Sequence, residues 1–450
     1  MRKLSLFVSF CLFFGLFAGL RPVSASYRPP DSVQINSRAV YLYNLDAETR
    51  VFEQEAQTRM APASLAKIMT CILALENTDD LEEEIEFPSY IWNMVEPGAS
   101  QADVRQGEIL TMRKALYCLM LQSDCYSALA IADKVGDGDI QAFVDMMNDK
   151  AALIGAQNTY FTNPHGLYDE GMYTTAYDMF LIARYAIKLD NFMDIASTYT
   201  IDISPTNKEV HASKYNLFST IYPMYPGNTY YYEPIKGIKT GTLDEVGRNF
   251  VSMASKDGYN YLLVLMGAPN RDATGEPLQE NLSFIDAKNI YEWAFNEFET
   301  KQLLEKGKTC NSVPVRLSKE ADTVNLLAAE SFSALVPKGI EVDAESGLSV
   351  MLRYTKPDSI DAPVSRGKKI GTVDLMLNNE VLGTVDLLAE KDIPRSQTLY
   401  MLDYLKGFFD QLWIKFVLVL VILILGFYIT LMVLRNRYRK RYRRARGRKR

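Results

Sequence analysis

Two pairs of segments with strand-like patterns lie near the two ends of the first 300 residues. Residues 39–44 and 50–54 are rich in β-branched and aromatic side chains and flank turn-forming residues, which is typical of a β-hairpin. Residues 249–254 and 261–266 flank the turn signal Asp257-Gly258 and predict a second hairpin. The simplest arrangement is one antiparallel sheet that joins these distant segments.

Longer apolar runs without proline occupy much of the chain between and after these hairpins, and they predict helices that flank the sheet. Their apolar residues recur at helical spacing, as at positions 143, 146, 147 and 153. The predicted helices cover residues 64–76, 110–121, 126–135, 140–153, 175–189 and 284–298.

The sequence changes in character after about residue 309. Short apolar segments alternate with turn residues, which indicates a small, separate β-rich domain without any cluster that suggests chemistry. An amphipathic, aromatic segment at 400–413 follows and is suited to lie at a membrane surface. The predicted strands cover residues 313–317, 324–327, 348–352, 373–377 and 381–385.

Both ends of the chain carry apolar segments beside basic residues. Residues 4–20 are apolar, follow Arg2 and Lys3, and precede small residues at 23–25, which predicts a secretory signal peptide. A retained anchor helix is the alternative interpretation. Near the other end, the segment 416–434 contains 19 residues without a charge, which is long enough to cross a bilayer.

A basic tail follows this predicted span, with 11 Lys or Arg residues from position 435 to 450 and no acidic residue. By the positive-inside rule, it predicts a single-pass protein of the cell membrane with a cytoplasmic tail and the preceding domains outside. Anionic lipids would contact such a tail. Nucleic-acid binding is the competing interpretation of a basic run. Because the run adjoins a span, we expect no nucleic-acid partner.

These patterns divide the chain into six predicted parts. They are a signal peptide (1–25), a first domain with the candidate chemistry (30–300), a small β-rich domain (306–392), a juxtamembrane segment (396–413), a transmembrane helix (414–434) and a cytoplasmic tail (435–450).

Charge and cysteine content narrow the function classes. Without the tail and residues 1–25, 35 basic residues face 55 acidic ones, a net charge of −20 that argues against generic polyanion binding. With only two histidines, His165 and His211, a His-dependent triad or a His-ligated metal centre is not expected. We expect buried thiols, rather than a disulfide scaffold or zinc site, at Cys71, Cys118, Cys125 and Cys310.

Ser64 and Lys67, at the start of the predicted helix 64–76, are a candidate nucleophile and base. Residues three apart share one face of a helix. A lysine in apolar surroundings loses its charge more easily and can take the proton of a serine hydroxyl. The first helical turn also favours a developing negative charge. The alternative is a surface lysine one turn from a helix-capping serine, and the pair alone does not decide between them.

Three further motifs accompany this pair. Lys-Thr-Gly-Thr at 239–242 combines a lysine and a hydroxyl, which can bind a carboxylate, with a glycine that admits a substrate closely. Ser-Asp-Cys at 123–125 lies at a turn between helices, where the serine could relay a proton; an ordinary polar turn is the alternative. Asn-Pro-His-Gly-Leu at 163–167 forms a turn ahead of the helix start at Thr175.

In this order and at these separations, the motifs resemble those of the serine-type D-alanyl-D-alanine carboxypeptidases, the low-molecular-mass penicillin-binding proteins. The run 62–70 and the run 163–167 are specific to that family rather than to serine hydrolases in general. The resemblance covers residues 35–300 closely and the β-rich domain more loosely. It implies an α+β fold of the β-lactamase/transpeptidase type, with an antiparallel sheet flanked by helices and a helical subdomain. A separate small all-β domain and one C-terminal transmembrane helix would follow.

The resemblance also implies roles for residues. Ser64 attacks the carbonyl between the terminal D-alanines of a peptidoglycan pentapeptide, Lys67 is the base, and Ser123 passes a proton to the leaving D-alanine. The N–H groups of Ser64 and Thr242 form the oxyanion hole. Implied partners are the peptidoglycan stem peptide and β-lactams, which would acylate Ser64, with no metal or cofactor. The implied substrate-binding residues are Lys239 and Thr240, which hold the terminal carboxylate, together with Gly241, Thr242 and Cys125.

Two positions depart from the family pattern. Cys125 stands where asparagine is usual, so an amide that orients the substrate is missing. Ser283 lies near the place of a usual arginine, for which Arg271 is a candidate substitute. The alternatives are therefore a non-catalytic wall-binding or scaffolding protein and a β-lactamase, although the span, the β-rich domain and the lack of a recognisable deacylating Glu motif oppose a β-lactamase. His165 is expected to be a structural turn residue.

Overall fold

The computed structural model describes residues 27–96, 98–343 and 349–446 of the 450-residue chain, and the side chains of those up to residue 441. The predicted signal peptide, residues 1–25, lies outside the described residues.

The first domain is built on a five-stranded antiparallel sheet in the order β2-β1-β9-β8-β7. Both predicted hairpins form, and they meet where β1 pairs with β9, with Leu42 opposite Leu263. Within this sheet β7 has a neighbour on one side only, so it forms an edge. The strands are β1 (Ala39–Asn44), β2 (Thr49–Gln54), β7 (Ile235–Leu243), β8 (Gly247–Lys256) and β9 (Tyr259–Ala268).

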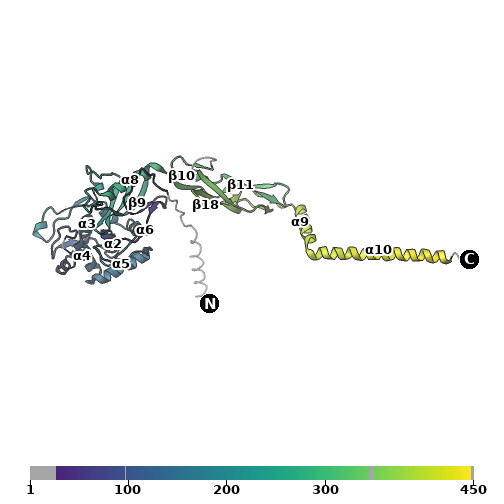
Figure 1. Ribbon diagram of the computed structural model, residues 1–450, viewed down its shortest axis with the longest axis horizontal. Helices are drawn as coiled ribbons and strands as arrows, with labels where there is room; N and C mark the ends of the chain where they lie inside the picture. The colour runs from purple at the N-terminus through teal and green to yellow at the C-terminus, as the bar shows by residue number, and fades with distance from the viewer. Residues whose placement is uncertain (1–26, 97, 344–348, 447–450) are drawn as a thin grey trace. The chain divides into compact units, whose positions relative to one another are not determined.

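Helices cover both faces of this sheet (Figure 1). On one face, Tyr41 of β1 contacts Phe180 of α6 (Ala176–Ala186). On the other face, Phe52 of β2 contacts Trp293 of α8 (Leu282–Glu297). Because both faces are covered, all six residues of β1 are buried, instead of alternating between buried and exposed.

The central helix of the domain is α2 (Ala66–Glu76), in which nine of 11 residues are buried. It packs against α3, α4, α5, α6 and α7, so the residues at its start are held from several sides. At the starts of α3, α4 and α5, the side chains of Thr111, Asp124 and Asp139 accept backbone N–H groups that would otherwise lack partners. The bounds are α3 (Met112–Leu121), α4 (Cys125–Val135), α5 (Ile140–Ile154) and α7 (Phe192–Ala196).

The predicted helix boundaries were wrong at several places. Ser64 lies in a 3₁₀ turn, η1 (Ala63–Leu65), ahead of α2. Residues 110–111 belong to β4 (Ile109–Thr111). Thr111 caps α3, which therefore begins at Met112. Residues 187–189 lie beyond the end of α6. Leu153 is 77% exposed, because it lies on the side of α5 opposite the buried Phe143, Val144 and Met147.

Short pairs of strands and 3₁₀ turns complete the loops of the first domain. β3 (Glu84–Glu86) pairs with β4, and β5 (Thr200–Asp202) pairs with β6 (Asn216–Phe218). The sequence did not predict these strands, because three residues are too few to show a period. The 3₁₀ turns are η2 (Ser89–Asn93), η3 (Glu209–His211) and η4 (Tyr222–Met224).

The C-terminal part contains a seven-stranded sheet in the order β14-β15-β17-β18-β12-β11-β16 and a two-stranded pair, β10-β13. Each predicted strand overlaps an observed one. Of the strands that were missed, β14 and β16 have only two residues each, and β10 begins directly after α8 at Phe298, which had been assigned to the helix. The bounds are β10 (Phe298–Leu304), β11 (Thr309–Arg316), β12 (Thr323–Ala328), β13 (Phe332–Pro337), β14 (Glu341–Val342), β15 (Ser349–Thr355), β16 (Ile360–Asp361), β17 (Lys369–Leu377) and β18 (Glu380–Ala389).

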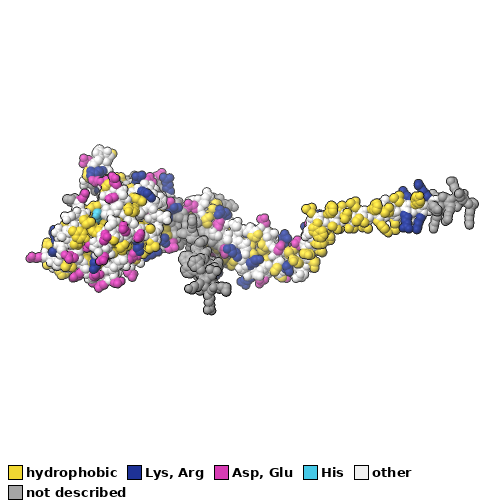
Figure 2. Space-filling model, turned by 90° about the horizontal axis from the view of Figure 1, so that it is seen from below, with side chains coloured by type: hydrophobic (Ala, Val, Ile, Leu, Met, Phe, Trp, Pro, Cys, Tyr) yellow, Lys and Arg dark blue, Asp and Glu magenta, His cyan; other side chains and the backbone are white. Residues whose placement is uncertain are grey.

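Two helices follow this sheet, α9 (Gln397–Asp410) and α10 (Leu412–Arg446). One helix among the described residues, spanning 412–441, is long and apolar enough to cross a membrane. Figure 2 shows its hydrophobic side chains giving way to Lys and Arg toward the C-terminus. α9 also exposes large apolar side chains, as expected for an amphipathic juxtamembrane segment: Tyr400, Met401, Leu402, Tyr404, Leu405, Phe408 and Phe409.

Candidate active site

Ser64 and Lys67 face each other at the start of α2. The Lys67 ammonium nitrogen Nζ lies 3.1 Å from Ser64 Oγ, within hydrogen-bonding distance. The Lys67 side chain is fully buried, whereas Ser64 is partly exposed. The alternative of a surface lysine beside a capping serine is therefore not what the fold contains.

Two other elements hold the Lys67 amine. Its Nζ donates to the backbone carbonyl oxygen of His165 at 2.5 Å and lies 3.5 Å from Cys125 Sγ at the start of α4. Among the described residues, no carboxylate forms an ion pair with Lys67. The amine is thus fixed in position by neutral groups.

The turn at 163–167 packs directly against the segment that carries Ser64. Gly166 has φ +79°, and a Cβ atom there would lie 1.9 Å from the carbonyl oxygen of Ala63, so only glycine fits. The Asn163 side chain closes the turn by accepting from Gly166 N at 2.7 Å and donating to Leu167 O at 3.1 Å. Thr70 of α2 donates to Pro164 O at 2.6 Å. These bonds place the His165 carbonyl where Lys67 reaches it.

His165 itself is buried and accepts a hydrogen bond from Leu167 N through Nδ1. Burial, with a smaller contribution from the charge of Lys67, lowers the pKa of His165 from 6.5 to about 3. The imidazole is therefore uncharged near neutral pH, as suits a structural turn residue.

The strand β7 brings Lys239 and Gly241 to the same place. A Cβ atom at Gly241 would lie 3.2 Å from Ser64 N and 3.1 Å from Ala63 Cβ, so the glycine lets the strand pass close to the serine. Lys239 is fully buried and donates from Nζ to Thr240 O at 3.0 Å. Burial, and next the charge of Lys67, hold the pKa of Lys239 well below its usual range, while Cys125 opposes the shift. The two amines thus interact electrostatically.

Neighbouring elements contact the two threonines of β7. Thr240 Oγ1 lies 2.7 Å from Thr220 Oγ1, in the loop after β6. Thr242 lies opposite Arg248 of β8 in the register of the two strands. The next residue on that strand, Asn249, donates from Nδ2 to the carbonyls of Ala61 and Pro62 at 3.2 and 3.1 Å, so β8 fixes the segment just before Ser64.

Ser123 and Cys125 flank the Asp124 cap of α4. Ser123 adopts φ +58°, and its buried hydroxyl has no hydrogen-bond partner among the described residues. Asp124 accepts from Ala102 N at 3.1 Å and Ser127 N at 2.7 Å, and its burial raises its pKa. These bonds fix the helix start, which presents the Cys125 thiol to Lys67.

The structure brings together most of the site residues that the sequence predicted. The Lys67 amine lies beside the Ser64 hydroxyl and the Cys125 thiol. Lys239 interacts electrostatically with Lys67 and Cys125, and Gly241 lies against the serine. The sequence did not point to Thr220 or Asn249, because an isolated polar residue in a loop or strand carries no signal of its tertiary contacts.

Arg271 and Ser283, the two residues considered for the place of the missing arginine, bond to residues outside β7. Arg271 pairs with Asp244 at 2.8 Å and donates to Gly275 O at 3.0 Å, and Ser283 is buried and donates to Asn281. Arg248, opposite Thr242, donates to Leu278 O at 3.0 Å and to Glu280 O, just before α8.

Of the expected buried thiols, Cys71, Cys118 and Cys125 are buried and Cys310 is half-buried, and all four are unpaired. The described residues contain no group of His, Cys, Asp or Glu arranged to hold a metal ion.

Sequence comparisons identify two family regions. Residues 24–270, more than half of the chain, match the family model described as D-alanyl-D-alanine carboxypeptidase, and residues 298–395 match the C-terminal domain of penicillin-binding protein 5. The D-alanyl-D-alanine carboxypeptidase DacF of Bacillus subtilis is 28% identical over 386 residues, covering 84% of this chain and 90% of its own length. DacA of Escherichia coli is 26% identical over 421 residues, covering 91% and 97%.

Solved structures of similar proteins share this fold. The D-alanyl-D-alanine carboxypeptidase DacD of Francisella tularensis has a TM-score of 0.62 at 20% identity and covers 85% of this chain and 98% of its own. Penicillin-binding protein 5 of Haemophilus influenzae has a TM-score of 0.57 at 22% identity, with coverages of 82% and 100%. These likenesses confirm the predicted fold: a transpeptidase-like α+β domain followed by an all-β domain. The geometry of Ser64, Lys67 and Lys239 agrees with the family match. The chain belongs to the D-alanyl-D-alanine carboxypeptidase family.

Proposed function

We propose that this protein removes the terminal D-alanine from peptidoglycan pentapeptides through an acyl-enzyme on Ser64, and that β-lactams acylate the same serine. The observation that carries the proposal is the 3.1 Å contact between Ser64 Oγ and the buried Lys67 amine. A serine hydroxyl becomes a useful nucleophile only when a base can take its proton. Lys67 is the amine in reach of that hydroxyl, and its position is fixed by His165 and Cys125.

The two buried amines have different proposed roles. A charge on Lys67 disfavours a charge on Lys239. A substrate carboxylate held by Lys239 and Thr240 favours the charged form of Lys239. The carboxylate contact thereby places the substrate carbonyl beside Ser64, where Lys67 takes the proton of the serine hydroxyl.

The later steps use groups around the same serine. The N–H groups of Ser64 and Thr242 stabilise the oxyanion, which the close approach of Gly241 to Ser64 N supports. Ser123, whose hydroxyl is buried without another partner among the described residues, passes a proton to the leaving D-alanine. Water then hydrolyses the ester on Ser64. Cys125 contributes to this wall of the substrate site, and no metal or cofactor takes part.

The family match and the apolar helix support a proposal for the cellular location of this reaction. We propose that the signal segment 1–25 exports the chain, that 414–434 spans the cell membrane once, and that the domains before it lie outside, where peptidoglycan is. The basic residues of α10 then lie in the cytoplasm and contact anionic lipids rather than nucleic acid.

Fluorescent penicillin labelling of the full chain tests the nucleophile. We expect a labelled band in the parent and none in Ser64→Ala, with release of D-alanine from a pentapeptide lost in parallel. Equal labelling of both proteins would refute the assignment of Ser64. Absent labelling and absent D-alanine release in a folded parent would favour the wall-binding or scaffolding protein, and rapid turnover of the β-lactam without D-alanine release would favour a β-lactamase.

A further inference from the structure

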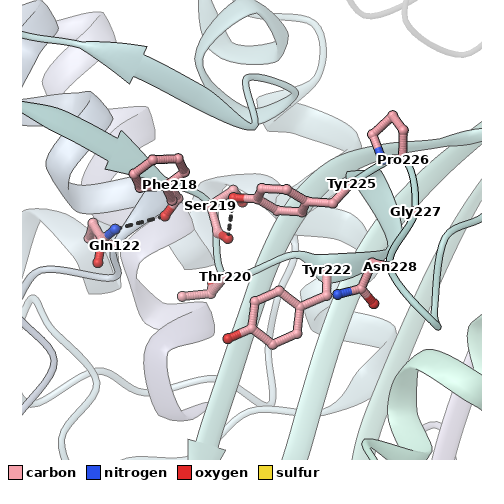
Figure 3. A pocket seen from close by; sticks show the side chains of 9 residues that line it. All are labelled: Gln122, Phe218, Ser219, Thr220, Tyr222, Tyr225, Pro226, Gly227 and Asn228. Carbon is pink, nitrogen blue, oxygen red and sulfur yellow. Dashed lines mark hydrogen bonds between the residues drawn. The ribbon is translucent and has the colours of Figure 1, made fainter.

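A pocket with a volume of about 470 Å³ adjoins the candidate active site (Figure 3). This volume falls within the range of about 300–1,000 Å³ that is usual for small-molecule sites. Its nine lining residues come from the C-terminal end of α3, from β6 and from the loop that carries η4, and none of them is charged. A charged group would lose hydration there without meeting a counter-charge, so the pocket suits an uncharged ligand.

Two aromatic rings of the pocket are available to a ligand. Phe218 and Tyr222 are 53% and 50% exposed. The Tyr222 ring is nevertheless held in place, because it packs edge-to-face against Phe284 of α8 and against Tyr225, with 6.1 and 6.2 Å between ring centroids. An aromatic ring is a flat apolar surface, and the C–H groups on one face of a sugar ring can pack against it.

The polar groups of the pocket have unused hydrogen-bonding capacity. Gln122 Nε2 donates to Phe218 O at 2.8 Å, as Figure 3 shows, and Asn228 Oδ1 accepts from Tyr230 N at 2.9 Å. Among the described residues, Gln122 Oε1, Asn228 Nδ2 and the Tyr222 hydroxyl have no hydrogen-bond partner. The pocket thus offers an amide acceptor and an amide donor, which match the N–H and the carbonyl oxygen of an acetamido group.

Internal bonds fix the walls of the pocket. The Tyr225 hydroxyl donates to Ser219 O at 2.7 Å and to Tyr199 O at 2.8 Å, and the first of these bonds is drawn in Figure 3. Thr220 N donates to Leu121 O at 3.0 Å at the end of α3. Because these walls are already ordered, a ligand would not have to order them when it binds.

The pocket lies beside the groups that the proposed function assigns to the substrate. Thr220 Oγ1 lies 2.7 Å from the hydroxyl of Thr240, which is proposed to hold the terminal carboxylate. Gln122 directly precedes Ser123, the proposed proton donor. A ligand in the pocket would therefore be a neighbour of the bound stem peptide.

From this chemistry and this placement, we propose that the pocket binds an N-acetylated amino sugar of a peptidoglycan glycan strand. The stem peptide is a poorer occupant, because it carries carboxylates and amines for which the lining has no counter-charge. Glycan strands carry the stem peptides, so binding of a neighbouring sugar would raise the effective concentration of the substrate at Ser64. The choice of this polymer rests on the proposed function, whereas the affinity for amino sugars follows from the lining of the pocket.

Isothermal titration calorimetry of the full chain, in a zwitterionic detergent without a sugar head group, tests the inference. The first probe is chitotetraose, the β-1,4-linked tetramer of N-acetylglucosamine. The second is cellotetraose, which has a hydroxyl in place of each acetamido group. We expect the parent to bind chitotetraose with a Kd of about 1 mM or below, and cellotetraose at least about tenfold more weakly.

Three variants assign the binding to the pocket. Tyr222→Ala should weaken chitotetraose binding at least about tenfold, whereas Tyr222→Phe keeps the ring and should stay within about threefold of the parent. Asn228→Ala should weaken the binding of chitotetraose but not that of cellotetraose, because it removes a partner of the acetamido group. D-alanine release from a soluble pentapeptide and penicillin labelling should stay within about twofold in all three. The matched control Tyr90→Ala removes a tyrosine that is 43% exposed and bonded to Asp133 near the C-terminal end of α4, and it should change neither binding nor release.

Each outcome decides the inference. A parent that releases D-alanine but does not bind chitotetraose, or binds both tetrasaccharides equally, overturns it while the proposed function stands. Chitotetraose binding that is unchanged in Tyr222→Ala also overturns it, because the sugar would then lie elsewhere. If a free stem tripeptide binds and loses affinity in Tyr222→Ala while chitotetraose does not bind, the pocket is a peptide site and the inference is wrong. Binding of chitotetraose by a parent that neither releases D-alanine nor is labelled by penicillin would uphold the sugar site and overturn the proposed function.

Discussion

Lys67 differs from most lysines in having buried, uncharged neighbours and a serine hydroxyl in reach. Its contacts are the His165 carbonyl oxygen at 2.5 Å, Ser64 Oγ at 3.1 Å and Cys125 Sγ at 3.5 Å. A buried amine without an ion-pair partner is costly unless the fold has a use for it.

Replacing Lys67 by methionine should therefore remove acylation while keeping the fold. Methionine is similar in length and prefers the buried environment, so we expect the melting temperature to be unchanged or raised. Acylation by fluorescent penicillin should fall by at least about a thousandfold, because Lys67 is the base that hydrogen-bonds to Ser64 among the described residues. Stopped-flow labelling and thermal unfolding measure the two effects. Acylation of Lys67→Met at the parental rate would show that another group activates the serine.

His165 gives a pH dependence with a definite sign. Its pKa is lowered from 6.5 to about 3, so the unfolded state binds the proton more readily than the folded state. The stability that depends on neutral His165 is complete above pH 6.5 and decreases as the pH falls toward 3. This amounts to about 2 kcal/mol by pH 5.

The variant His165→Asn isolates this contribution, since an asparagine oxygen can accept the hydrogen bond from Leu167 N. Between pH 7.5 and 5, we expect the parent to lose about 2 kcal/mol more unfolding free energy than the variant, as measured by denaturant titration. Parallel pH profiles for the two proteins would contradict the assignment. Acylation near neutral pH should be little affected, because the contact to Lys67 comes from the backbone.

Three elements meet at the serine, and their fit depends on the backbone rather than on side chains. The turn at 163–167 and the strand β7 both approach η1 closely, at Gly166 and Gly241. Asn249 of β8 ties the carbonyls just before Ser64 to the sheet. Ser64 is therefore positioned by contacts among segments that are more than 90 residues apart in sequence.

Gly166→Ala tests this fit between elements. The added carbon would meet the Ala63 carbonyl oxygen at 1.9 Å in addition to adopting a left-handed φ, so we expect a loss of about 2–4 kcal/mol in stability. Acylation should also slow, since the turn can relieve the clash only by moving the His165 carbonyl away from Lys67.

Gly155→Ala is the matched control, because it has φ +94° but no atom within 4 Å of the added carbon. It should cost only about 1 kcal/mol and leave acylation unchanged. Chemical denaturation and penicillin labelling of both variants measure the difference. Equal costs for the two variants would mean that the close approach of Gly166 to η1 does not exist.

Most helices and strands could be predicted from the sequence, but the turns and loops that join them could be predicted less well. The two hairpins, α2, α4, α5 and α8 follow from hydrophobic period and turn residues, and Ser64 with Lys67 follows from spacing. The 3₁₀ turn at Ala63–Leu65 was missed because its geometry is imposed by tertiary contacts such as those of Gly166 and Asn249. The pocket beside Thr240 was not foreseen either, because the loop residues that line it bear no periodic pattern.

At the scale of the whole molecule, the proposed topology depends on the last helix. α10 continues from its apolar part into the basic residues, so the two form one continuous element up to Arg446. Basic residues resist translocation and remain on the cytoplasmic side.

Replacing the 11 Lys and Arg residues of 435–450 by glutamine should weaken this orientation. In the parent, we expect a C-terminal epitope tag to be protected from protease added to intact spheroplasts. The glutamine variant should give a mixed or accessible tag. Glutamine at 11 exposed Asp and Glu positions of the first domain is a control with the same number of substitutions and should leave the tag protected. An accessible tag in the parent would contradict the proposed topology.

The burial of Lys239 has a consequence for which molecules can react at all. A peptide whose C-terminus is an amide or a methyl ester brings no anion to favour the charged form of this amine. Such a compound would lack the contact that holds its carbonyl carbon beside Ser64. We therefore expect neutral acyl compounds to acylate the serine slowly, and ligands that carry a carboxylate to acylate it fast.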